Sequence, residues 1–516
     1  MSANQFEPPP PGRQRSRAPP VAEADATLAW NSFFRSIEKL DRAVNDLRRR
    51  TPDFSAATPM RAWQRVFLFI AVGCLTAGLI LRDDTALFVW VLGLALPFLA
   101  VAGVRIVAAW HILSRASDDR EMFACDRRFD ARLPPYSVLI PLYREVAAVP
   151  GLMQAMLRLD YPADRLEILF ITEANDPATR RALREIGLAP YMRIVTVPSG
   201  EPRTKPRALN YALQDARGAL VTVYDAEDIP GPDQLRRAAE AFIEEGPRLA
   251  CVQARLGIYN ADQSFLSRQF ALEYSALFRG LLPALAHLGL PIPLGGTSNH
   301  FRRDLLWKWG GWDPFNVTED ADLGIRLARL GYQVSLIQAE TLEEAPAAWR
   351  TWRGQRTRWI KGWMQTYLVH MRRPMMLWRE LGWWRFSGFQ VIIGGMILSI
   401  LVHPWFYALA AIHVLAGDPI TPSNVVLDWV CGANLATGYG AAWLLTIATA
   451  MRSGSLRRLL SAIWLPIYWL AISWAAYRAL FELVRRPFHW EKTAHTGAGA
   501  DLLLRSRTPF EYRSNA

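Results

Sequence analysis

The sequence predicts a cytoplasmic α/β domain with a parallel sheet, inserted between α-helical transmembrane segments. Apolar runs long enough to cross a hydrocarbon core of about 30 Å lie on both sides of a central region. Within that region, short β-rich runs alternate with helical patterns, which is typical of a parallel sheet covered on both faces. The 516 residues are 51% hydrophobic and only 21% charged, a mix that fits apolar segments beside an ordinary soluble domain.

Three segments are predicted before the central region. Residues 1–24 are rich in Pro and Arg without an apolar core, so they predict a disordered tail and not a secretory signal peptide. Residues 25–62 predict an amphipathic cytoplasmic helix, because apolar positions recur with a period near 3.6. Residues 63–112 contain two apolar runs, predicted as two transmembrane helices. Arginines flank this hairpin on both outer sides, and the positive-inside rule then places the following chain in the cytoplasm.

Residues 130–348 are predicted to form the α/β domain. The expected strands are YSVLIP, LEILFI, MRIVTV and ALVTVYD, at 136–141, 166–171, 192–197 and 219–225. Helical patterns occupy 149–158, 176–186, 205–215 and 232–244. In such sheets ligands bind at the carboxyl ends of the strands. Polar clusters stand at those ends, so the sequence predicts a binding site at this edge.

Membrane segments are expected again after the domain. Residues 349–386 are rich in Trp and Arg and are predicted as interfacial helices, and residues 387–451 as two further transmembrane helices. The apolar run within 456–484 carries charged residues and is predicted to be membrane-embedded. If it crossed once, the basic tail at 485–516 would lie outside. A re-entrant or in-plane helix, or two short spans, is therefore expected, which keeps this tail in the cytoplasm.

The charge and the cysteines limit the function classes. The net charge is +12, which indicates an anionic partner. Many basic residues flank the apolar runs, so a membrane surface and a diphosphate substrate are favoured over nucleic acid. The four cysteines are scattered without ligand spacing, which argues against a disulfide framework or a zinc site.

Two acidic motifs are candidates for chemistry. Asp225-Ala226-Glu227 directly follows a hydrophobic strand, and two such carboxylates can share one Mg²⁺ or Mn²⁺ with substrate phosphates. Either Glu227 or Asp228 could complete that metal site, and an acidic turn without metal is the alternative. Thr318-Glu319-Asp320 begins an amphipathic pattern, where Asp320 is either a helix-capping anion or a general base.

Two further motifs are candidates for substrate binding. Gln355-Arg356-Thr357-Arg358-Trp359 offers an Arg fork for phosphate and a Trp face for a sugar ring. An interfacial membrane helix is the alternative for this segment. The turn Gly295-Gly296-Thr297-Ser298-Asn299-His300 is either a plain loop or a place where the backbone approaches an acceptor closely.

Taken together and in this order, the four motifs resemble the inverting family-two glycosyltransferases. The resemblance is closest to the processive branch of cellulose, chitin and hyaluronan synthases, and it covers roughly 135–371 with the flanking membrane helices. Thr318-Glu319-Asp320 and Gln355-x-x-Arg358-Trp359 stand intact. The family usually has Asp-Asp where this chain has Thr172-Glu173, and Asp-x-Asp where it has Asp225-x-Glu227. The resemblance implies a GT-A fold, a Rossmann-like parallel sheet.

The resemblance also implies a role for each matching residue. Asp320 would be the catalytic base, and Asp225 and Glu227 would hold Mg²⁺ or Mn²⁺ on the diphosphate of a UDP-sugar. The nucleotide-sugar pocket would be formed by Pro141, Tyr143, Glu145, Glu173, Lys205, Asp225, Gln355 and Arg358. The acceptor site would be formed by Trp359, which stacks on the terminal sugar, and by Thr318, Glu319, Gly296, Thr297, Ser298, Asn299 and His300.

The function implied is a processive hexosyltransferase that inverts C1 of a UDP-sugar, with UDP-glucose expected, and makes a β-linked polysaccharide. The expected partners are the donor, the growing polysaccharide and the lipid bilayer of the cell inner (plasma) membrane, with accessory export subunits left open. No nucleic acid is expected. Residues 488–497 loosely resemble the gating segment of cellulose synthases. A transferase that adds one sugar to a lipid carrier is the main alternative, and a transporter with a nucleotide-sensing domain is another.

Overall fold

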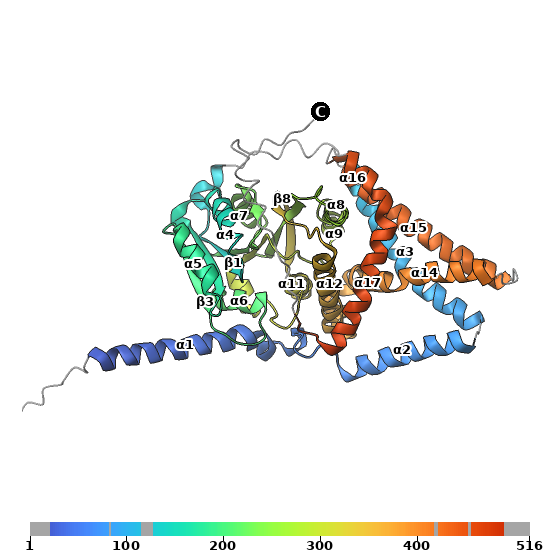
Figure 1. Ribbon diagram of the computed structural model, residues 1–516, viewed down its shortest axis with the longest axis horizontal. Coiled ribbons are helices and arrows are strands. Elements are labelled where there is room, and N and C mark those ends of the chain that lie inside the picture. The colour runs from blue at the N-terminus through green and yellow to red at the C-terminus, as the bar shows by residue number, and fades with distance from the viewer. Residues whose placement is uncertain (1–20, 82–83, 115–126, 417–421, 453–455, 490–516) are drawn as a thin grey trace, which may run out of the picture.

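The computed structural model describes residues 21–81, 84–114, 127–416, 422–452 and 456–489. An α/β domain lies beside a group of long apolar helices (Figure 1). Helix α1 (Val21–Arg50) begins inside the predicted disordered tail. The rest of that tail, and the predicted C-terminal tail after His489, lie outside the described residues.

In the described part of the chain, one sheet of eight strands has the order β3-β2-β1-β4-β7-β6-β8-β5. The strands are β1 (Tyr136–Leu142), β2 (Leu166–Glu173), β3 (Met192–Val197), β4 (Leu220–Val223), β5 (Ile229–Pro230), β6 (Leu249–Ile258), β7 (Asn299–Arg302) and β8 (Gln333–Glu343). The first four correspond to the four predicted strands, and those predictions are confirmed. Successive side chains of β1 enter different cores, Val138 and Ile140 one and Leu139 the other, so both faces of the sheet are covered.

The sheet is mostly parallel, as expected, but it contains antiparallel pairs. Strand β1 is parallel to β2 and β4, but β7 runs antiparallel to both β4 and β6. Strand β7 lies in the segment that the sequence presents as a polar turn. Polar side chains in and just before this strand are paired inside the protein: Tyr136 Oη lies 2.6 Å from His300 Nδ1, and Ser298 Oγ lies 2.6 Å from Thr341 Oγ1. A strand whose hydrogen bonds replace apolar contacts shows no hydrophobic pattern.

Helices cover the two faces and extend the domain toward the membrane segments. The predicted helices are confirmed as α4 (Val149–Leu157), α5 (Pro177–Ile186), α6 (Lys205–Leu213) and α7 (Gln234–Glu244). They are followed by α8 (Phe265–Ser275), the π-helical η5 (Ala276–Leu281), α9 (Leu282–His287), α10 (Arg303–Lys308), α11 (Glu319–Arg329) and α12 (Trp349–His370). A third core joins α8, α12 and the C-terminal helix α17 (Leu465–Arg485) around Phe270, Trp352 and Tyr468.

The remaining long helices are α2 (Ala62–Leu81), α3 (Asp84–Ser114), α13 (Pro374–Phe389), the π-helical η6 (Gln390–Gly395), α14 (Met396–Ala416) and α15 (Pro422–Arg452). Among the described residues, Val91–Ser114, Pro374–Ala408 and Leu459–Arg485 are helical stretches long and apolar enough to cross a membrane. Ala62–Cys74 is a shorter apolar helix. These helices indicate an integral membrane protein.

Three details differ from the expected membrane segments. Gly382 has a φ of 73°, a conformation that favours glycine, and it interrupts α13 between its interfacial part and the apolar part. Helix α15 has 31 residues and packs along α3 (Figure 1), but among the described residues it is not one of the stretches apolar enough to count as a span. The segment after 456 forms the short α16 (Leu456–Ser461) and then α17, one continuous helix instead of two short spans. Helix α17 packs on α12, between the domain and the other apolar helices (Figure 1).

Candidate active site

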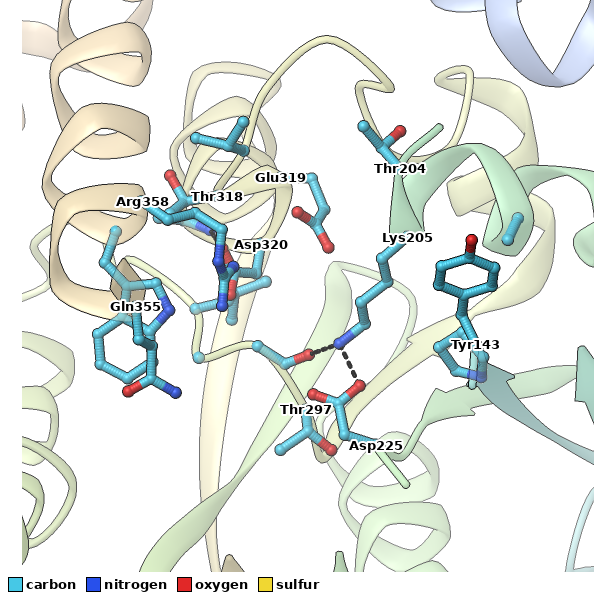
Figure 2. Close-up of a pocket in the computed structure, with 18 of the residues that line it drawn as sticks. Tyr143, Thr204, Lys205, Asp225, Thr297, Thr318, Glu319, Asp320, Gln355 and Arg358 are labelled. Atoms are coloured by element: carbon cyan, nitrogen blue, oxygen red, sulfur yellow. Dashed lines mark hydrogen bonds and ion pairs between the residues drawn. The ribbon is translucent and has the colours of Figure 1, made fainter. Parts of the chain in front are cut away.

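A cavity of about 1050 Å³ opens at the carboxyl ends of β1, β2 and β4, as the sequence predicts for the site. The predicted site residues that line it are Pro141, Tyr143, Glu145, Glu173, Lys205, Asp225, Glu227, Gly296, Thr297, Thr318, Glu319, Asp320, Gln355, Arg358 and Trp359. Figure 2 shows Lys205, Asp225, Asp320 and Arg358 around the same space. Residues that lie more than 100 positions apart in the chain therefore meet at one place.

Three predicted acceptor residues do not line the cavity. Ser298, Asn299 and His300 are buried, at the start of β7 and within it, and their side chains face other parts of the sheet. Asn299 Nδ2 donates to the carbonyl oxygen of Gly295 at 2.5 Å. The sequence predicts these residues at the site because polar residues that follow glycines are typical of an exposed turn.

The acidic motif after β4 contacts one cation. Lys205 Nζ, at the start of α6, lies 2.6 Å from Asp225 Oδ1 and donates to the carbonyl oxygen of Gly296 at 2.7 Å (Figure 2). Burial alone would lower the pKa of Lys205, but the charges of Asp225 and Glu319 outweigh it and raise this pKa. Lys205 thus holds a positive charge between the two acidic motifs.

Glu227 and Asp228 differ in what they contact. Asp228 is 1% exposed and is used by the fold: its Oδ2 accepts from the Asp225 amide at 2.7 Å and from Thr297 Oγ1. Glu227 lines the cavity. Burial, and then the charge of Asp225, raises the pKa of both carboxyl groups well above the usual value. An excess of buried negative charge therefore faces the cavity beside Asp225.

This donor set fits a divalent cation that is shared with a substrate. Among the described residues, no three His, Cys, Asp or Glu side chains converge as a complete protein cage. Mg²⁺ commonly binds through one or two carboxylates plus substrate phosphates. Asp225 and Glu227 offer oxygen ligands of that kind, in a region where negative charge is in excess.

Asp320 lies in the first turn of α11 and faces the Gly295-Gly296 turn. A Cβ atom built on Gly296 would lie 3.1 Å from Asp320 Oδ2, so this glycine leaves room beside the carboxylate. Burial raises the pKa of Asp320, against the opposing effects of Lys205 and Arg358. Burial, and then the charge of Asp320, raises the pKa of Glu319 to about 7. Two adjacent carboxyl groups with raised pKa values are typical of acid–base sites.

Helix α12 presents its motif on one face. Gln355, Arg358 and Trp359 are spaced i, i+3 and i+4, so they project from the same side, and all three line the cavity. The ring of Trp359 stacks on that of Tyr274, with centroids 6.2 Å apart and planes 24° apart. The guanidinium of Arg356 lies 4.9 Å from the Trp359 ring centroid. Trp359 is therefore held in one orientation at the cavity wall.

Comparison with known proteins identifies this arrangement. A family model described as "Glycosyltransferase like family 2" matches residues 134–362, which contain all of the motifs above. Residues 134–362 are thus similar to family-two glycosyltransferases. This segment lies beside helices long and apolar enough to cross a membrane.

The chain is similar to curated glycosyltransferases whose names state different products. It is 26% identical over 302 residues to β-monoglucosyldiacylglycerol synthase of Synechocystis sp., covering 57% of this chain and 60% of that one. It is 26% identical over 382 residues to a probable glucomannan 4-β-mannosyltransferase of Arabidopsis thaliana, covering 68% of this chain and 63% of that one. This chain therefore spans less than two thirds of either relative's own length.

The fold is similar to a solved structure. A mannosyltransferase from Pyrobaculum calidifontis, in complex with GDP-Man and Mn²⁺, superposes with a TM-score of 0.50 and 20% identity. The likeness covers 76% of this chain and 99% of that one. The predicted GT-A fold is thereby confirmed, with a mixed sheet that is mostly parallel.

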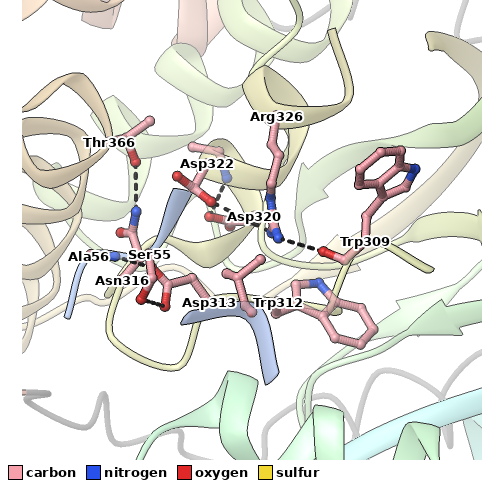
Figure 3. A network of polar contacts seen from close by, with 12 residues as sticks. Ser55, Ala56, Trp309, Trp312, Asp313, Asn316, Asp320, Asp322, Arg326 and Thr366 are labelled. Carbon is pink, nitrogen blue, oxygen red and sulfur yellow. Dashed lines mark hydrogen bonds and ion pairs between the residues drawn. The ribbon is translucent and has the colours of Figure 1, made fainter. Parts of the chain in front are cut away.

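The loop before Asp320 is braced from two directions (Figure 3). Asp313 is fully buried and accepts hydrogen bonds from Ser55 Oγ at 3.2 Å and from the Ala56 amide, both in the segment before α2. Asn316 Nδ2 donates to Thr366 Oγ1 of α12 at 3.0 Å. The loop that leads to the candidate base is thus tied both to the N-terminal segment and to α12.

Glu173, predicted to read the nucleotide base, is already paired. Both of its carboxylate oxygens accept from Arg207 Nη2 at 2.6 Å, and Arg207 is 0% exposed. Burial raises the pKa of Glu173, which Arg207 opposes. A base in this cavity would meet a neutralised carboxylate and not a free anion.

The cavity is also lined by Phe488 and His489, which belong to the segment 488–497 that resembles a gating segment. Sequence reasoning missed several other residues of the cavity. Val44 and Asn45 come from α1, which was given no role, and Tyr274 and Phe278 come from α8 and η5. Glu343 is another. The aromatic spacing of Tyr274 and Phe278 is a local signal, but it resembles core packing. The remaining residues carry no signal before the tertiary structure brings them together.

Proposed function

We propose that the protein is a membrane-embedded processive glycosyltransferase that polymerises a UDP-sugar, most simply UDP-glucose, into a β-linked polysaccharide. One observation carries the proposal. Asp225 of the diphosphate motif, the candidate base Asp320 and the stacking residue Trp359 all line one cavity. That cavity is lined in part by α12, which packs on α17 between the domain and the apolar helices (Figure 1). The diphosphate-binding residue, the base and the acceptor platform are therefore close enough to take part in the transfer of a single sugar.

The donor end of the cavity would bind the diphosphate. Asp225 and Glu227 would hold Mg²⁺ or Mn²⁺, which neutralises the leaving diphosphate when bound. Lys205 and Arg358 are the cations of this chain that face the same region. Lys205 would exchange its contact with Asp225 for a phosphate oxygen. Pro141, Tyr143 and Glu145 would border the nucleotide at the end of β1.

The chemical step would use Asp320. Its carboxylate would take the proton of an acceptor hydroxyl, and the resulting oxygen would attack C1 opposite the diphosphate. A single displacement inverts C1, so an α-linked donor gives a β-linked product. The turn at Gly296, which crowds no atom against Asp320 Oδ2, would let the acceptor approach.

The acceptor end would be the face of Trp359. A sugar ring stacked there would present its terminal hydroxyl toward Asp320, with Thr318 and Glu319 beside it. After each transfer the chain would move on by one sugar and leave toward the membrane helices. We infer that the catalytic domain is cytoplasmic and that the protein is multi-pass in the inner membrane, with crossings within 63–112 and 387–451 and a further membrane-embedded, re-entrant or in-plane segment at 456–484.

Transfer of one sugar to a lipid is the second candidate. It is supported by the similarity to β-monoglucosyldiacylglycerol synthase. The apolar helices beside the domain would give a lipid acceptor access to the same base. The stacking platform at Trp359 favours polymerisation instead, since a single transfer needs no site for a growing chain.

The deciding experiment is incorporation of label from each radiolabelled donor, including GDP-Man, by the purified protein with Mg²⁺ or Mn²⁺. We expect high-molecular-weight product from one UDP-sugar that a linkage-specific β-glycanase degrades, and no product after chelation of the metal. Label that enters only small lipid-extractable material would establish the second candidate. Product from GDP-Man alone would contradict the proposed UDP donor.

The transfer rate should fall as the pH is lowered toward the raised pKa of Asp320. Asp320 must be a carboxylate to accept a proton, and its raised pKa means that the protonated, inactive form accumulates at a higher pH than for an ordinary Asp side chain. Glu319, with a pKa raised to about 7, loses its charge as the pH falls through that value. Initial rates at saturating donor test this, with UDP affinity at each pH as the control. A rate that stays constant down to the ordinary Asp pKa of about 4 would contradict the role of Asp320.

A further inference from the structure

Glu343 is a cavity residue without an assigned role. It is the last residue of β8 and lines the cavity together with the donor and acceptor motifs. Its strand places it there by alternation: Thr341, two residues earlier on the same face, bonds Ser298 and Gln234 beneath the cavity. Glu343 therefore lies on that same face of β8, at the point where the face borders the cavity.

The carboxylate of Glu343 is only partly satisfied. Tyr274 Oη donates to Glu343 Oε2 at 3.3 Å. Within the described part of the chain, Glu343 Oε1 is buried and accepts no hydrogen bond from the protein. A buried acceptor without a donor is costly and calls for an explanation, which in a substrate cavity is a group that the substrate brings.

The position of Glu343 lies between the two ends of the site. On one side it interacts electrostatically with Asp228, Glu227 and Asp225, and with Lys205 as the opposing cation. On the other side its partner Tyr274 stacks on Trp359, the proposed acceptor platform. A group between the diphosphate-binding acids and the acceptor platform lies where the transferred sugar must sit.

We propose that Glu343 Oε1 accepts a hydrogen bond from a hydroxyl group of the sugar being transferred, and so selects which hexose the enzyme uses. This inference rests on the proposed function. Sugar hydroxyls are donors, and a carboxylate forms the stronger, charge-assisted kind of hydrogen bond with them. Direct binding of the cation by Glu343 is the competing assignment, and it predicts that loss of Glu343 weakens the binding of UDP as much as that of the UDP-sugar.

The consequence is a specific pattern of donor discrimination. A site that hydrogen-bonds a substrate hydroxyl strongly rejects the analogue that lacks it, because the buried group is then left unpaired. The wild type should therefore use one monodeoxy form of its donor sugar about 100-fold less well than the parent. Removing Glu343 should remove that penalty at this hydroxyl position and at no other.

The test compares kcat/KM for the parent donor and its monodeoxy UDP-sugars in the wild type, E343Q and E343A. With the parent donor, we expect a loss of about tenfold in E343Q and about 100-fold in E343A. For the deoxy donor that the wild type rejects, the penalty should shrink below about threefold in E343A. E340Q is the matched control. Glu340 lies on the same strand, its carboxylate pairs with Arg279 at 2.7 Å, and it does not line the cavity. E340Q should keep the wild-type pattern.

Two measurements keep the outcomes separate. Competition of each UDP-sugar against radiolabelled UDP in Mn²⁺ needs no turnover, so it tests Glu343 even in an inactive variant and verifies that the variant is folded. An unchanged deoxy pattern in E343A, or an equal loss of UDP and UDP-sugar affinity, would overturn the inference; the latter would assign Glu343 to the cation. A wild type that makes no product from any donor contradicts the proposed function instead, and the competition assay still decides the role of Glu343.

Discussion

Asp320→Asn should lower kcat for sugar transfer by about 10³-fold, which is the range that a positioned general base contributes. The amide has the same shape but accepts no proton, so the acceptor hydroxyl would have to attack without deprotonation. Because Asp320 lies beside the diphosphate site and is not one of its proposed ligands, UDP affinity in Mn²⁺ should change less than about twofold. Single-turnover incorporation and UDP titration measure the two quantities on the same preparation.

The adjacent carboxylate provides the control for this prediction. Glu319→Gln changes a residue of the same helical turn and the same cavity, but leaves the base in place. It should therefore lose less activity than Asp320→Asn. Near wild-type turnover in Asp320→Asn would refute the assignment of the base, and an equal loss in both variants would point to the structure of the turn instead.

Trp359→Ala should shorten the polymer at least tenfold while leaving UDP affinity nearly unchanged. Aromatic faces bind apolar ring surfaces, and truncation removes the only part of the side chain that the growing chain could contact. The growing chain would then dissociate after few additions, so short products accumulate although the base and the diphosphate site are intact. Sizing of labelled product by gel filtration, with UDP titration in parallel, checks this.

Trp349→Ala is a matched control on the same helix. Trp349 stacks on Trp352 with centroids 5.2 Å apart, is 44% exposed and does not line the cavity. Its removal should leave product length unchanged. Equal losses of polymer length and UDP affinity in Trp359→Ala would contradict an acceptor platform, and single-sugar lipid products in the wild type would make product length irrelevant.

Patterns that depend on local sequence were predicted well. The strands that became β1 to β4 are continuous apolar runs, and their helices have amphipathic periods, so their existence and order follow from the chain alone. The motifs around Asp320 and Trp359 were also located, and the structure brings both to one cavity. Whether each residue has its proposed role remains a prediction.

Features that depend on distant partners could not be predicted. Strand β7 is recognisable only once Tyr136 and Thr341 supply partners for its polar side chains, and this reversal makes the sheet mixed. The same holds for Glu173, whose partner Arg207 lies 34 positions away. Glu343 carries no local signal at all, because its position follows from the register of β8 against β6.

The bracing of the loop before Asp320 has a consequence for where the catalytic unit begins. The carboxylate of Asp313 accepts hydrogen bonds from the Ser55 hydroxyl and the Ala56 amide. Arg372 donates to the carbonyl oxygens of Pro52 and Asp53 at 3.1 and 3.3 Å. A fragment cut at residue 130, the start of the sequence-defined domain, would leave both buried charges without these partners. The smallest piece of this protein that folds with its base in place is therefore discontinuous in the chain: it includes the N-terminal segment on the far side of the first membrane hairpin. The anchor and the enzyme are one cooperative structure and not two separable modules.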